Sequence, residues 1–282
     1  MIVAATTKLA GVLAWPVSHS LSPRVHGYWL EVNGIDGLYL PLAVRPEHFA
    51  TAVRVLAAVG FRGFNVTLPH KEAALAAVDE VSALARRIGA VNTVIVRADG
   101  SLLGENSDAF GFTENLKAAA PGLRAEDGPA VVLGAGGAAR AVVAALQDLR
   151  APEIRVLNRT RVRAENLARA LGGAVKVWPW AGRERALEGA HLLVNATSLG
   201  LAGAEALELS LENLPASAVV NDLVYTPLET PLLAGARRRG LVAVDGLGML
   251  LHQARLGFAA WYGVEPQVTD AQRAFVLAGS PC

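Results

Sequence analysis

Segments with the pattern of a β-strand and segments with the pattern of an α-helix alternate along the whole of this chain. Short apolar runs are typical of buried strands, and between most of them apolar residues recur at helical spacing. Such alternation builds βαβ units, in which a helix connects two parallel strands, so the predicted fold class is α/β. The chain has 282 residues, which suits one large domain or two modest ones.

The pattern predicts where these elements lie. Expected strands cover residues 9–14, 38–44, 64–68, 92–97, 102–105, 130–133, 154–157, 174–177, 192–196, 218–223 and 241–244. Expected helices cover residues 23–32, 46–59, 71–78, 108–120, 138–149, 161–171, 231–239, 247–262 and 270–278. A turn at 98–100 predicts a hairpin between two of the strands, and a polar stretch at 121–129 separates two units. On the pattern alone, the two C-terminal helices could belong to either unit.

Composition excludes several classes of protein. Hydrophobic residues make up 52% of the chain, which rules out a disordered protein. A net charge of +1 gives no general attraction to nucleic acid or to an anionic membrane. The single cysteine, Cys282, excludes an internal disulfide and a cysteine metal cluster. No apolar run reaches the ~18–20 residues of a membrane span, and no signal peptide is evident, so we expect a cytoplasmic protein.

The most informative motif follows the apolar strand at 130–133 and opens a predicted helix. It reads Gly134-Ala135-Gly136-Gly137-Ala138-Ala139. Gly134 permits the tight turn, Gly136 lets the backbone approach a pyrophosphate, and Ala139 keeps helix and strand close. The N–H groups at the start of the helix attract phosphate. A glycine-rich turn without a ligand would share the pattern, but its position between strand and helix favours dinucleotide binding.

The end of the next strand indicates which dinucleotide binds. NAD-binding units usually carry an acidic residue there, which bonds the ribose 2′-hydroxyl. Here the strand leads into Asn158-Arg159-Thr160-Arg161 instead. No carboxylate in this run repels a 2′-phosphate, and Arg159 and Arg161 offer planar donor groups that bind one. An exposed, arginine-rich helix start is the alternative in a chain this rich in arginine. We expect NADP(H) rather than NAD.

Hydroxyl groups gather before the first helix of the chain. Ser18-His19-Ser20-Leu21-Ser22-Pro23 carries three serines and an imidazole. Ser22 could simply be the N-cap, with Pro23 at the first helical position. That interpretation leaves Ser20 unexplained, and two hydroxyls near a helix start also suit a small carboxylate ligand.

Lysine is scarce in this chain: only four of the 26 lysine and arginine residues are lysine. Lys71 is the only one where a predicted strand ends and a predicted helix starts, and ligands bind at the carboxyl ends of strands in open α/β sheets. A solvated lysine at a helix start is the alternative, although the helix dipole slightly disfavours a positive charge there. Asn92 and Asp108 also lie at element ends, and Asp108 could be only a helix cap.

Other chemistries lack their sequence patterns. The six histidines show no metal-ligand spacing, so we expect them to be surface or core residues and expect no metal site. No nucleophile-elbow motif occurs. The aromatic residues do not interleave with a basic patch, so nucleic acid is not an expected partner.

Taken together, the motifs resemble those of the NADP-dependent shikimate dehydrogenase family over nearly the whole chain. The motifs that carry the resemblance are residues 18–23, 65–71, 89–93, 104–108, 134–139, 158–160, 195–200, 222–227 and 246–253. Each motif alone is of moderate specificity, but all of them in this order are highly specific. The sequence departs from the family's usual residues at Ala14, Gly27, Ser107 and Thr226, beside the motif residues that matter most.

The resemblance implies two α/β domains with a cleft between them. Residues 1–105 would form a substrate-binding and catalytic domain, completed by C-terminal helices at 245–282. Residues 106–244 would form a Rossmann-type NADP-binding domain with a doubly wound parallel sheet. The implied partner is a small molecule, shikimate or 3-dehydroshikimate, and the chain is expected to be a monomer or a homodimer.

The resemblance also assigns roles residue by residue. Lys71 and Asp108 match the family's catalytic pair. The implied substrate-binding residues are Ser20, Ser22, Thr67, Asn92, Asp108, Tyr225 and Gln253. The implied cofactor-binding residues are Gly134, Ala135, Gly136, Gly137, Ala138, Asn158, Arg159, Thr160, Arg161, Thr197, Ser198, Leu223, Gly246 and Met249.

The implied activity is reversible reduction of 3-dehydroshikimate to shikimate by NADPH, in aromatic amino-acid and chorismate biosynthesis.

Three alternatives to this activity stay open. A quinate/shikimate dehydrogenase with relaxed substrate or NAD use is the nearest, because Ser20 and Ser22 do not exclude quinate. A methylene-tetrahydrofolate dehydrogenase would share the layout but not the full motif series. A nucleotide-binding module without catalysis would not need Lys71, Asp108 and Gln253.

Overall fold

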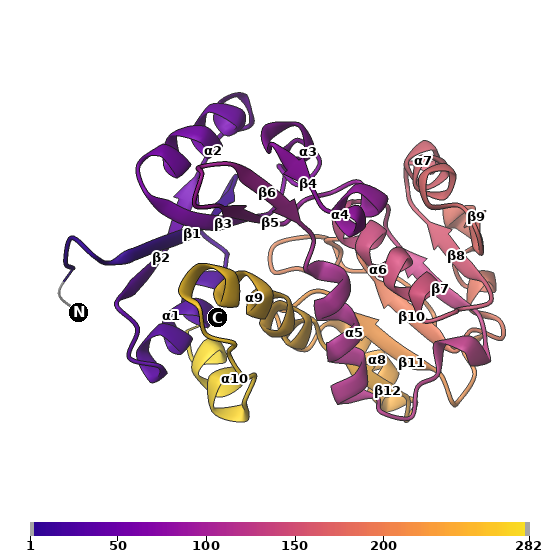
Figure 1. Cartoon of the computed structure of the whole chain (residues 1–282). Coiled ribbons are helices and arrows are strands. Elements are labelled where there is room, and N and C mark those ends of the chain that lie inside the picture. The colour runs from indigo at the N-terminus through magenta and orange to yellow at the C-terminus, as the bar shows by residue number, and fades with distance from the viewer. Residues whose placement is uncertain (1–2, 280–282) are drawn as a thin grey trace. The chain divides into compact units, whose positions relative to one another are not determined.

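The computed structural model describes residues 3–279, so Cys282 lies outside the described residues. The chain divides into two compact units (Figure 1). Unit 1 runs up to Ser107 and resumes at Leu251, and unit 2 is Asp108–Leu250. These borders differ by a few residues from the predicted ones at 105 and 245. The later border arises because helix α9, Gly246–Tyr262, is unbroken and shares its residues between the units.

Unit 1 is built on a mixed sheet. Its strands within the described residues are β1 Lys8–Ala14, β2 Gly37–Ala43, β3 Phe61–Val66, β4 Glu80–Val81, β5 Thr93–Val96 and β6 Leu102–Glu105, in the order β2-β1-β3-β5-β6-β4. Strand β1 pairs in parallel with β2 and β3, whereas β5 is antiparallel to both β3 and β6. The predicted hairpin is therefore present. This hairpin makes the sheet of unit 1 mixed, with parallel βαβ pairing among β1, β2 and β3.

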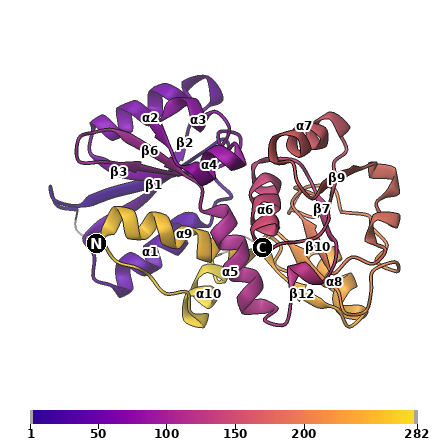
Figure 2. The ribbon, with the colours of Figure 1, turned by 45° about the vertical axis from the view of Figure 1, so that its right-hand side comes forward.

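The helices of unit 1 are α1 Ser22–Val32, α2 Phe49–Ala58, α3 Ala74–Ala77, α4 Ala83–Ile88, most of α9 and α10 Asp270–Leu277. Figures 1 and 2 show α2 on one side of the sheet and α1 with α9 on the other. The helix predicted over 71–78 is only α3. The Lys71 carbonyl accepts a hydrogen bond from the Val91 amide at 2.8 Å, which ties it to the neighbouring segment and not to a helix. Helix α4 and strand β4 were not predicted.

Aromatic packing attaches α9 to the sheet of unit 1. The Trp261 indole N–H donates to the Val94 carbonyl at 3.1 Å. Gly63, with φ +154°, makes room for this contact, because a Cβ there would collide with both groups. Trp261 and Phe258 of the same helix pack around the buried ring of His26. The second half of α9 and the whole of α10 therefore belong with unit 1, which settles the question that the sequence pattern left open.

The buried His26 predicts an acid sensitivity. Its ring is fully buried and stacks on Tyr39 at a centroid distance of 3.9 Å. Burial lowers the pKa of His26 from 6.5 to about 3, so the folded protein leaves it neutral while the unfolded chain protonates it below pH 6.5. The stabilisation is fully present above pH 6.5 and is lost as pH falls toward 3. We expect the free energy of unfolding to drop by about 1.4 kcal/mol per pH unit in this window from His26 alone.

Urea unfolding at a series of pH values measures this slope. The variant His26→Phe keeps an aromatic ring in the stack but cannot take up a proton, so its slope should be shallower than that of the wild type. Equal slopes of unfolding free energy against pH for the two proteins would show that His26 is not the source of the acid sensitivity.

Unit 2 is built on a parallel sheet. Its strands within the described residues are β7 Ala130–Leu133, β8 Ile154–Leu157, β9 Val175–Trp178, β10 Leu192–Asn195, β11 Val219–Asp222 and β12 Val242–Val244, in the order β12-β11-β10-β7-β8-β9. Every pair is parallel. The chain order reverses between β7 and β10, as in a doubly wound sheet, and ligands bind such sheets at the carboxyl ends beside that reversal. The predicted Rossmann-type sheet is thus the observed one.

The helices of unit 2 are α5 Asp108–Ala119, α6 Gly137–Asp148, α7 Arg161–Leu171, α8 Pro231–Arg238 and the start of α9. Figure 2 shows α5 beside α6. Strands β7 and β10 are buried throughout, so both faces of the sheet centre are covered. Continuous apolar runs such as Ala130–Leu133 follow from this burial on two faces.

Candidate active site

The glycine loop of unit 2 has the geometry that a dinucleotide needs. Gly134 has φ +114°, and a Cβ there would lie 2.7 Å from the Ala196 carbonyl oxygen, so only glycine fits between β7 and the loop after β10. Gly136, the N-cap of α6, differs, because its φ of −87° and ψ of −172° are open to any residue. A Cβ on Gly136 would meet no protein atom within 4 Å. The protein itself does not require glycine at this position, whereas close approach of a pyrophosphate does.

The rest of the loop supports the same fit. Ala139 is fully buried, as expected for the position where α6 lies closest to the sheet. Gly137 and Ala138 form the first turn of α6, and no side chain caps it. The first amides of the helix therefore face the space above Gly136, where a phosphate is stabilised by the helix dipole.

The arginine turn after β8 lies at the same end of the sheet. Asn158 donates its side-chain amide to the Thr160 carbonyl at 2.9 Å, which shapes the turn before α7. Arg159 and Arg161 are both exposed. Each forms an ion pair, Arg159 with Glu205 at 3.2 Å and Arg161 with Glu165 at 2.8 Å. The guanidinium groups are thus available at the surface beside the glycine loop.

A buried polar cluster holds the loops after β10 and β11. The Asn195 amide donates to the Leu199 carbonyl and to the Asp222 carboxylate, at 3.1 and 2.9 Å. The Thr197 hydroxyl donates to Asn195 Oδ1 at 2.7 Å, and Thr230 donates to Asp222 at 2.7 Å. Burial raises the pKa of Asp222, and the hydrogen bonds that its carboxylate accepts lower that pKa in part. The cluster fixes the backbone that presents two predicted cofactor residues, Thr197 and the exposed Ser198.

Two further predicted cofactor positions lie against each other. A Cβ on Gly246 would collide with the Leu223 carbonyl, so glycine allows the start of α9 to approach the end of β11. Two residues on, Gly248 packs against the side chain of Asn115, and Met249 is 7% exposed. Packing within unit 2 therefore explains both glycines, independently of any ligand.

Tyr225 follows the same loop. The Val224 amide donates to the Asp222 carboxylate at 3.1 Å, which fixes the backbone just before the tyrosine. Burial raises the pKa of Tyr225, so its phenol stays protonated at neutral pH. It is a hydroxyl donor at the carboxyl end of β11.

In unit 1, the predicted substrate residues gather where β1 and β3 end. The Thr67 amide donates to the Leu13 carbonyl at 3.0 Å, and the Val66 amide donates to the Asn92 carbonyl at 2.8 Å. Because the Val91 amide bonds the Lys71 carbonyl, Lys71 lies directly beside Asn92 along the backbone. The structure thus brings Thr67, Lys71 and Asn92 to one end of the sheet, with Lys71 half-buried.

The serine loop does not behave as a helix cap. Leu21 is the N-cap of α1 and makes no side-chain cap bond, while Ser22 is the first helical residue. The N-cap interpretation of Ser22 is therefore wrong, because Pro23 follows it inside the first turn. Ser20 Oγ instead accepts the Ser22 amide at 3.3 Å. Ser20 Oγ thus bonds within its own turn, and the Ser22 side chain hydrogen-bonds Tyr39.

A chain of buried hydrogen bonds fixes the two site amides. The Ser107 amide donates to Asn92 Oδ1 at 2.8 Å, and since a backbone N–H can only donate, the orientation of the Asn92 side chain is determined. Asn92 Nδ2 donates to Ser107 Oγ at 3.0 Å, and Ser107 Oγ donates to Gln253 Oε1 at 3.2 Å. Gln253 therefore turns its Nε2 donors away from Ser107.

The chain of hydrogen bonds continues to three residues that were not predicted as site residues: Tyr39, Asn65 and Thr93. The Tyr39 hydroxyl donates to Asn65 Oδ1 at 2.6 Å, Asn65 Nδ2 donates to Thr93 Oγ1 at 3.3 Å, and Thr93 donates to Asn92 Oδ1 at 3.0 Å. Burial raises the pKa of Tyr39 well above its usual value. In the sequence, the only sign of these hydrogen bonds is the pair of adjacent polar residues Asn92-Thr93 at the start of a buried strand. Its partners lie too far apart in sequence to be paired without the sheet register.

Asp108 is the first residue of α5 and of unit 2, and its side chain is 5% exposed. It directly follows Ser107, which links Asn92 to Gln253 in the hydrogen-bond chain of unit 1. The prediction that Asp108 begins a helix is confirmed.

Two of the histidines have structural contacts in unit 1. Within residues 3–279, no group of three or more His, Cys, Asp or Glu side chains could hold a metal ion. His70 is buried, stacks on Phe49 at 4.5 Å and bonds the Val44 carbonyl at 2.8 Å; burial lowers its pKa. With His26 in the aromatic stack, these two histidines are core residues.

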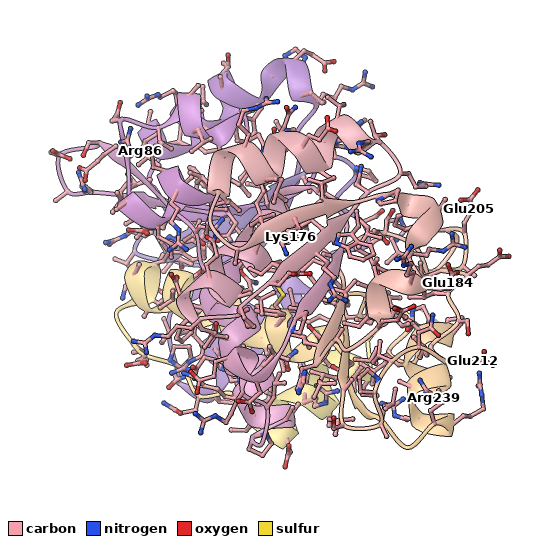
Figure 3. All side chains as sticks on the ribbon, turned by 90° about the vertical axis from the view of Figure 1, so that its right-hand side faces the viewer. Arg86, Lys176, Glu184, Glu205, Glu212 and Arg239 are labelled. Atoms are coloured by element: carbon pink, nitrogen blue, oxygen red, sulfur yellow. The ribbon has the colours of Figure 1, made fainter. Side chains whose placement is uncertain are left out.

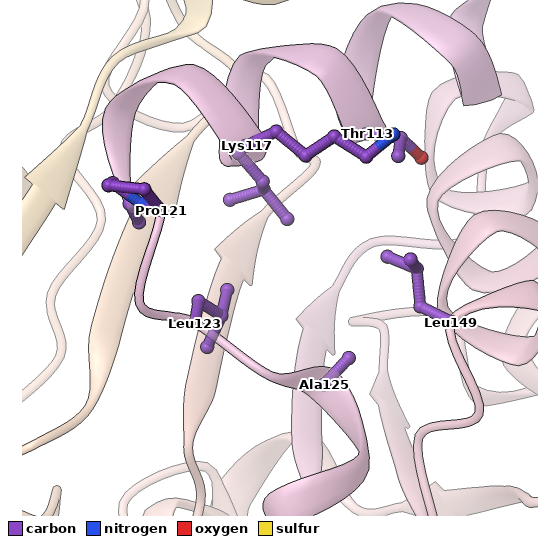
Figure 4. A pocket seen from close by; sticks show the side chains of 8 residues that line it. Thr113, Lys117, Pro121, Leu123, Ala125 and Leu149 are labelled. Atoms are coloured by element: carbon purple, nitrogen blue, oxygen red, sulfur yellow. The ribbon is translucent and has the colours of Figure 1, made fainter.

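A cavity of about 150 Å³ in unit 2 is separate from the glycine loop (Figure 4). It is lined by Thr113, Leu116, Lys117, Ala120, Pro121, Leu123, Ala125 and Leu149. Leu149 is the C-cap of α6, at the opposite end of that helix from Gly136. Lys117, on its rim, pairs with Glu114 at 2.9 Å. The cavity is mainly apolar and is not part of the predicted cofactor site.

Comparison with known proteins decides the family. Residues 12–94 match the family model described as the shikimate dehydrogenase substrate binding domain, and residues 117–214 match that described as shikimate / quinate 5-dehydrogenase. The shikimate dehydrogenase (NADP(+)) of Paramagnetospirillum magneticum is 61% identical over 96% of this chain and 98% of its own. This chain belongs to the shikimate dehydrogenase family.

Solved structures agree with that membership. The shikimate 5-dehydrogenase from Thermus thermophilus, in complex with NADP(H) and shikimate, is 42% identical with a TM-score of 0.83, covering 96% of this chain and 98% of that one. Quinate dehydrogenase from Corynebacterium glutamicum, in complex with NAD, is 30% identical with a TM-score of 0.89, covering 96% and 99%. Solved structures similar to this chain thus include complexes with NADP(H) and with NAD. No helix among the described residues is long and apolar enough to cross a membrane.

Proposed function

We propose that this protein catalyses the reversible reduction of 3-dehydroshikimate to shikimate with NADPH, a step toward chorismate and the aromatic amino acids. The observation that carries the proposal is that backbone pairing brings Thr67, Lys71 and Asn92 to one end of the sheet, where β1 and β3 end. They provide a hydroxyl, an ammonium and an amide to a small polyhydroxylated ring. The series of shikimate dehydrogenase relatives at 50–61% identity supports it.

The substrate would be held by groups of matched polarity. We assign its carboxylate to the hydroxyls of Ser20 and Ser22, neither of which caps α1. We assign its ring hydroxyls to Thr67, Asn92, Asp108 and Gln253, with Tyr225 as a further hydroxyl donor. Because Ser107 bonds both Asn92 and Gln253 on the side away from the ring, the two amides are pre-oriented before substrate arrives.

Lys71 and Asp108 are the proposed catalytic residues. When bound, NADPH supplies the hydride, and the carbonyl oxygen of the substrate then gains negative charge and needs a proton. The Lys71 ammonium can stabilise that charge and donate the proton, whereas arginine, with a pKa above ~12, is a poor proton donor. The Asp108 carboxylate would position the substrate hydroxyl and the lysine.

The cofactor is assigned to unit 2. The pyrophosphate would lie over Gly134–Ala138 at the start of α6, where the space beside Gly136 is open. The 2′-phosphate would bind Asn158, Arg159, Thr160 and Arg161, and Thr197, Ser198, Leu223, Gly246 and Met249 would line the remainder. The relatives named for NADP(+) support this choice of cofactor.

A second candidate is a quinate/shikimate dehydrogenase that also accepts NAD. The likeness to quinate dehydrogenase from Corynebacterium glutamicum favours it, and nothing about Ser20 or Ser22 rejects quinate. The absence of a carboxylate within the turn after β8 argues against NAD preference. A cytoplasmic location and a monomeric or homodimeric state also stay predictions.

Product identification tests the proposed reaction. Purified protein is incubated with 3-dehydroshikimate and NADPH, and the mixture is followed by proton NMR. We expect stoichiometric appearance of shikimate and NADP. Tight binding of NADP with no product in any condition would instead support a binding module without catalysis.

The orientation of the two site amides yields a separate prediction. Ser107→Ala removes the hydroxyl that bonds Asn92 and Gln253, and loss of a buried partner costs on the order of 1–3 kcal/mol. We expect KM for shikimate to rise about tenfold or more, while KM for NADP stays unchanged. Ser107→Thr keeps the hydroxyl and should restore the wild-type value. An equal loss for both variants would show that packing, not the hydroxyl, matters.

A further inference from the structure

Arg159, the proposed anchor of the 2′-phosphate, is held by a carboxylate from a distant part of unit 2. Its Nη1 lies 3.2 Å from Oε2 of Glu205. The neighbouring Arg161 also forms an ion pair, but its partner Glu165 is one turn along the same helix. Only the first of these two pairs connects separate segments of the fold.

The sheet order determines what this ion pair crosses. Arg159 follows β8 and Glu205 follows β10, and β7 lies between those two strands. The glycine loop begins where β7 ends. The pair therefore reaches across the carboxyl end of the strand from which the proposed cofactor loop starts, and Figure 3 shows Glu205 projecting from its loop.

The loop that carries Glu205 is shaped by its own backbone. The Gly200 amide donates to the Glu205 carbonyl at 2.8 Å, and the Ala202 amide donates to the Thr226 carbonyl at 2.8 Å. The backbone position of Glu205 thus does not depend on its side chain. The side chains of Arg159 and Glu205 are 62% and 79% exposed, so the ion pair is weak and open to exchange.

We propose that Glu205 is a specificity-determining residue, which occupies Arg159 until the 2′-phosphate of NADP displaces it. The proposal rests on the proposed role of Arg159. A phosphate carries more negative charge than a carboxylate, and it can accept two parallel bonds from the guanidinium where Glu205 has a single contact at 3.2 Å, so it displaces the glutamate. The exchange lowers the affinity for NADP, because the Arg159–Glu205 contact must first be lost. NAD has no 2′-phosphate and leaves the ion pair in place, so the affinity for NAD does not depend on Glu205.

Calorimetric titration of the full-length protein with NADP, NAD and adenosine 2′,5′-bisphosphate tests this exchange. Glu205→Gln should tighten NADP and the bisphosphate roughly two- to fivefold, the range of an exposed ion pair, and leave NAD unchanged. The matched control is Glu212→Gln, an exposed glutamate of the same unit that lies apart from Glu205 in Figure 3. It should change none of the three dissociation constants.

Adding Glu205→Gln to the Arg159→Ala variant distinguishes two effects of Glu205: competition with the 2′-phosphate for Arg159, and direct repulsion of the phosphate. There the gain from Glu205→Gln should vanish, because no guanidinium is left to release. A gain at least as large in that background would mean that Glu205 merely repels phosphate, and would overturn the proposal. Weaker NADP binding by Glu205→Gln in the wild-type background, or an equal gain for NAD, would overturn it as well.

The same set of variants distinguishes two failures. If Arg159→Ala leaves NADP affinity unchanged, the assigned role of Arg159 is wrong and the proposal falls with it. If Arg159→Ala weakens NADP but Glu205→Gln has no effect, only the role of Glu205 is wrong.

Discussion

Replacing Lys71 with alanine should lower kcat by about 10²- to 10⁴-fold, the usual contribution of a positioned proton donor. The dissociation constant for shikimate should change little, since the carboxylate and the ring hydroxyls have other partners. The measurement is steady-state turnover from the absorbance of reduced nicotinamide, with shikimate affinity measured separately by titration. Lys117→Ala is the matched control, because that exposed lysine pairs with Glu114 and should not affect turnover.

A second substitution separates the two proposed roles of Lys71. Lys71→Arg retains positive charge but is a poor proton donor near neutral pH. If proton donation dominates, its turnover should stay close to that of Lys71→Ala; if charge stabilisation dominates, a large part of the rate should return. Near-normal turnover of Lys71→Ala itself would remove the lysine from the mechanism.

Replacing Arg159 with alanine should raise KM for NADP by about ten- to a hundredfold. A charge-assisted, bidentate contact with a phosphate is worth on the order of 1.5–3 kcal/mol, and the substitution removes it. KM for shikimate should stay within about twofold of its wild-type value, because in this account the contact is made to the cofactor alone. Initial rates measured against each substrate in turn provide the comparison.

The control for this variant is Arg163→Ala, an exposed arginine in the first turn of α7, the helix that follows Arg159. It should leave both KM values unchanged. Equal increases for NADP and shikimate in Arg159→Ala would argue against a contact with the 2′-phosphate.

Local patterns in the sequence predicted most of the elements of unit 2. The apolar run at 130–133, followed by the glycine loop and a helix, appears as β7 and α6 with shifts of a single residue. Such a segment is determined by neighbours along the chain, because strand burial, the tight turn at Gly134 and helix spacing are all local. The hairpin of β5 and β6 was predictable for the same reason, from its turn at 98–100.

What could not be predicted depends on contacts between distant residues. The hydrogen bond from Tyr39 to Asn65 spans 26 positions, and that from Ser107 to Gln253 spans 146. Both require the register of the sheet and the return of α9, neither of which a local pattern encodes. The helix expected from Lys71 onward failed for a related reason, since the Lys71 carbonyl bonds a neighbouring segment and the helix is shorter. Likewise, the ion pair of Arg159 with Glu205 depends on the strand order, which brings their two segments to one end of the sheet.

The most direct test of the proposed activity is a comparison of kcat/KM for four pairs of substrates: shikimate or quinate, each with NADP or NAD. We expect shikimate with NADP to be the preferred pair by a wide margin, because we assign the 2′-phosphate to Arg159 and the ring hydroxyls to the oriented amides of Asn92 and Gln253. Comparable values with quinate or with NAD would contradict it, and would assign the protein to the broader-specificity branch of its family.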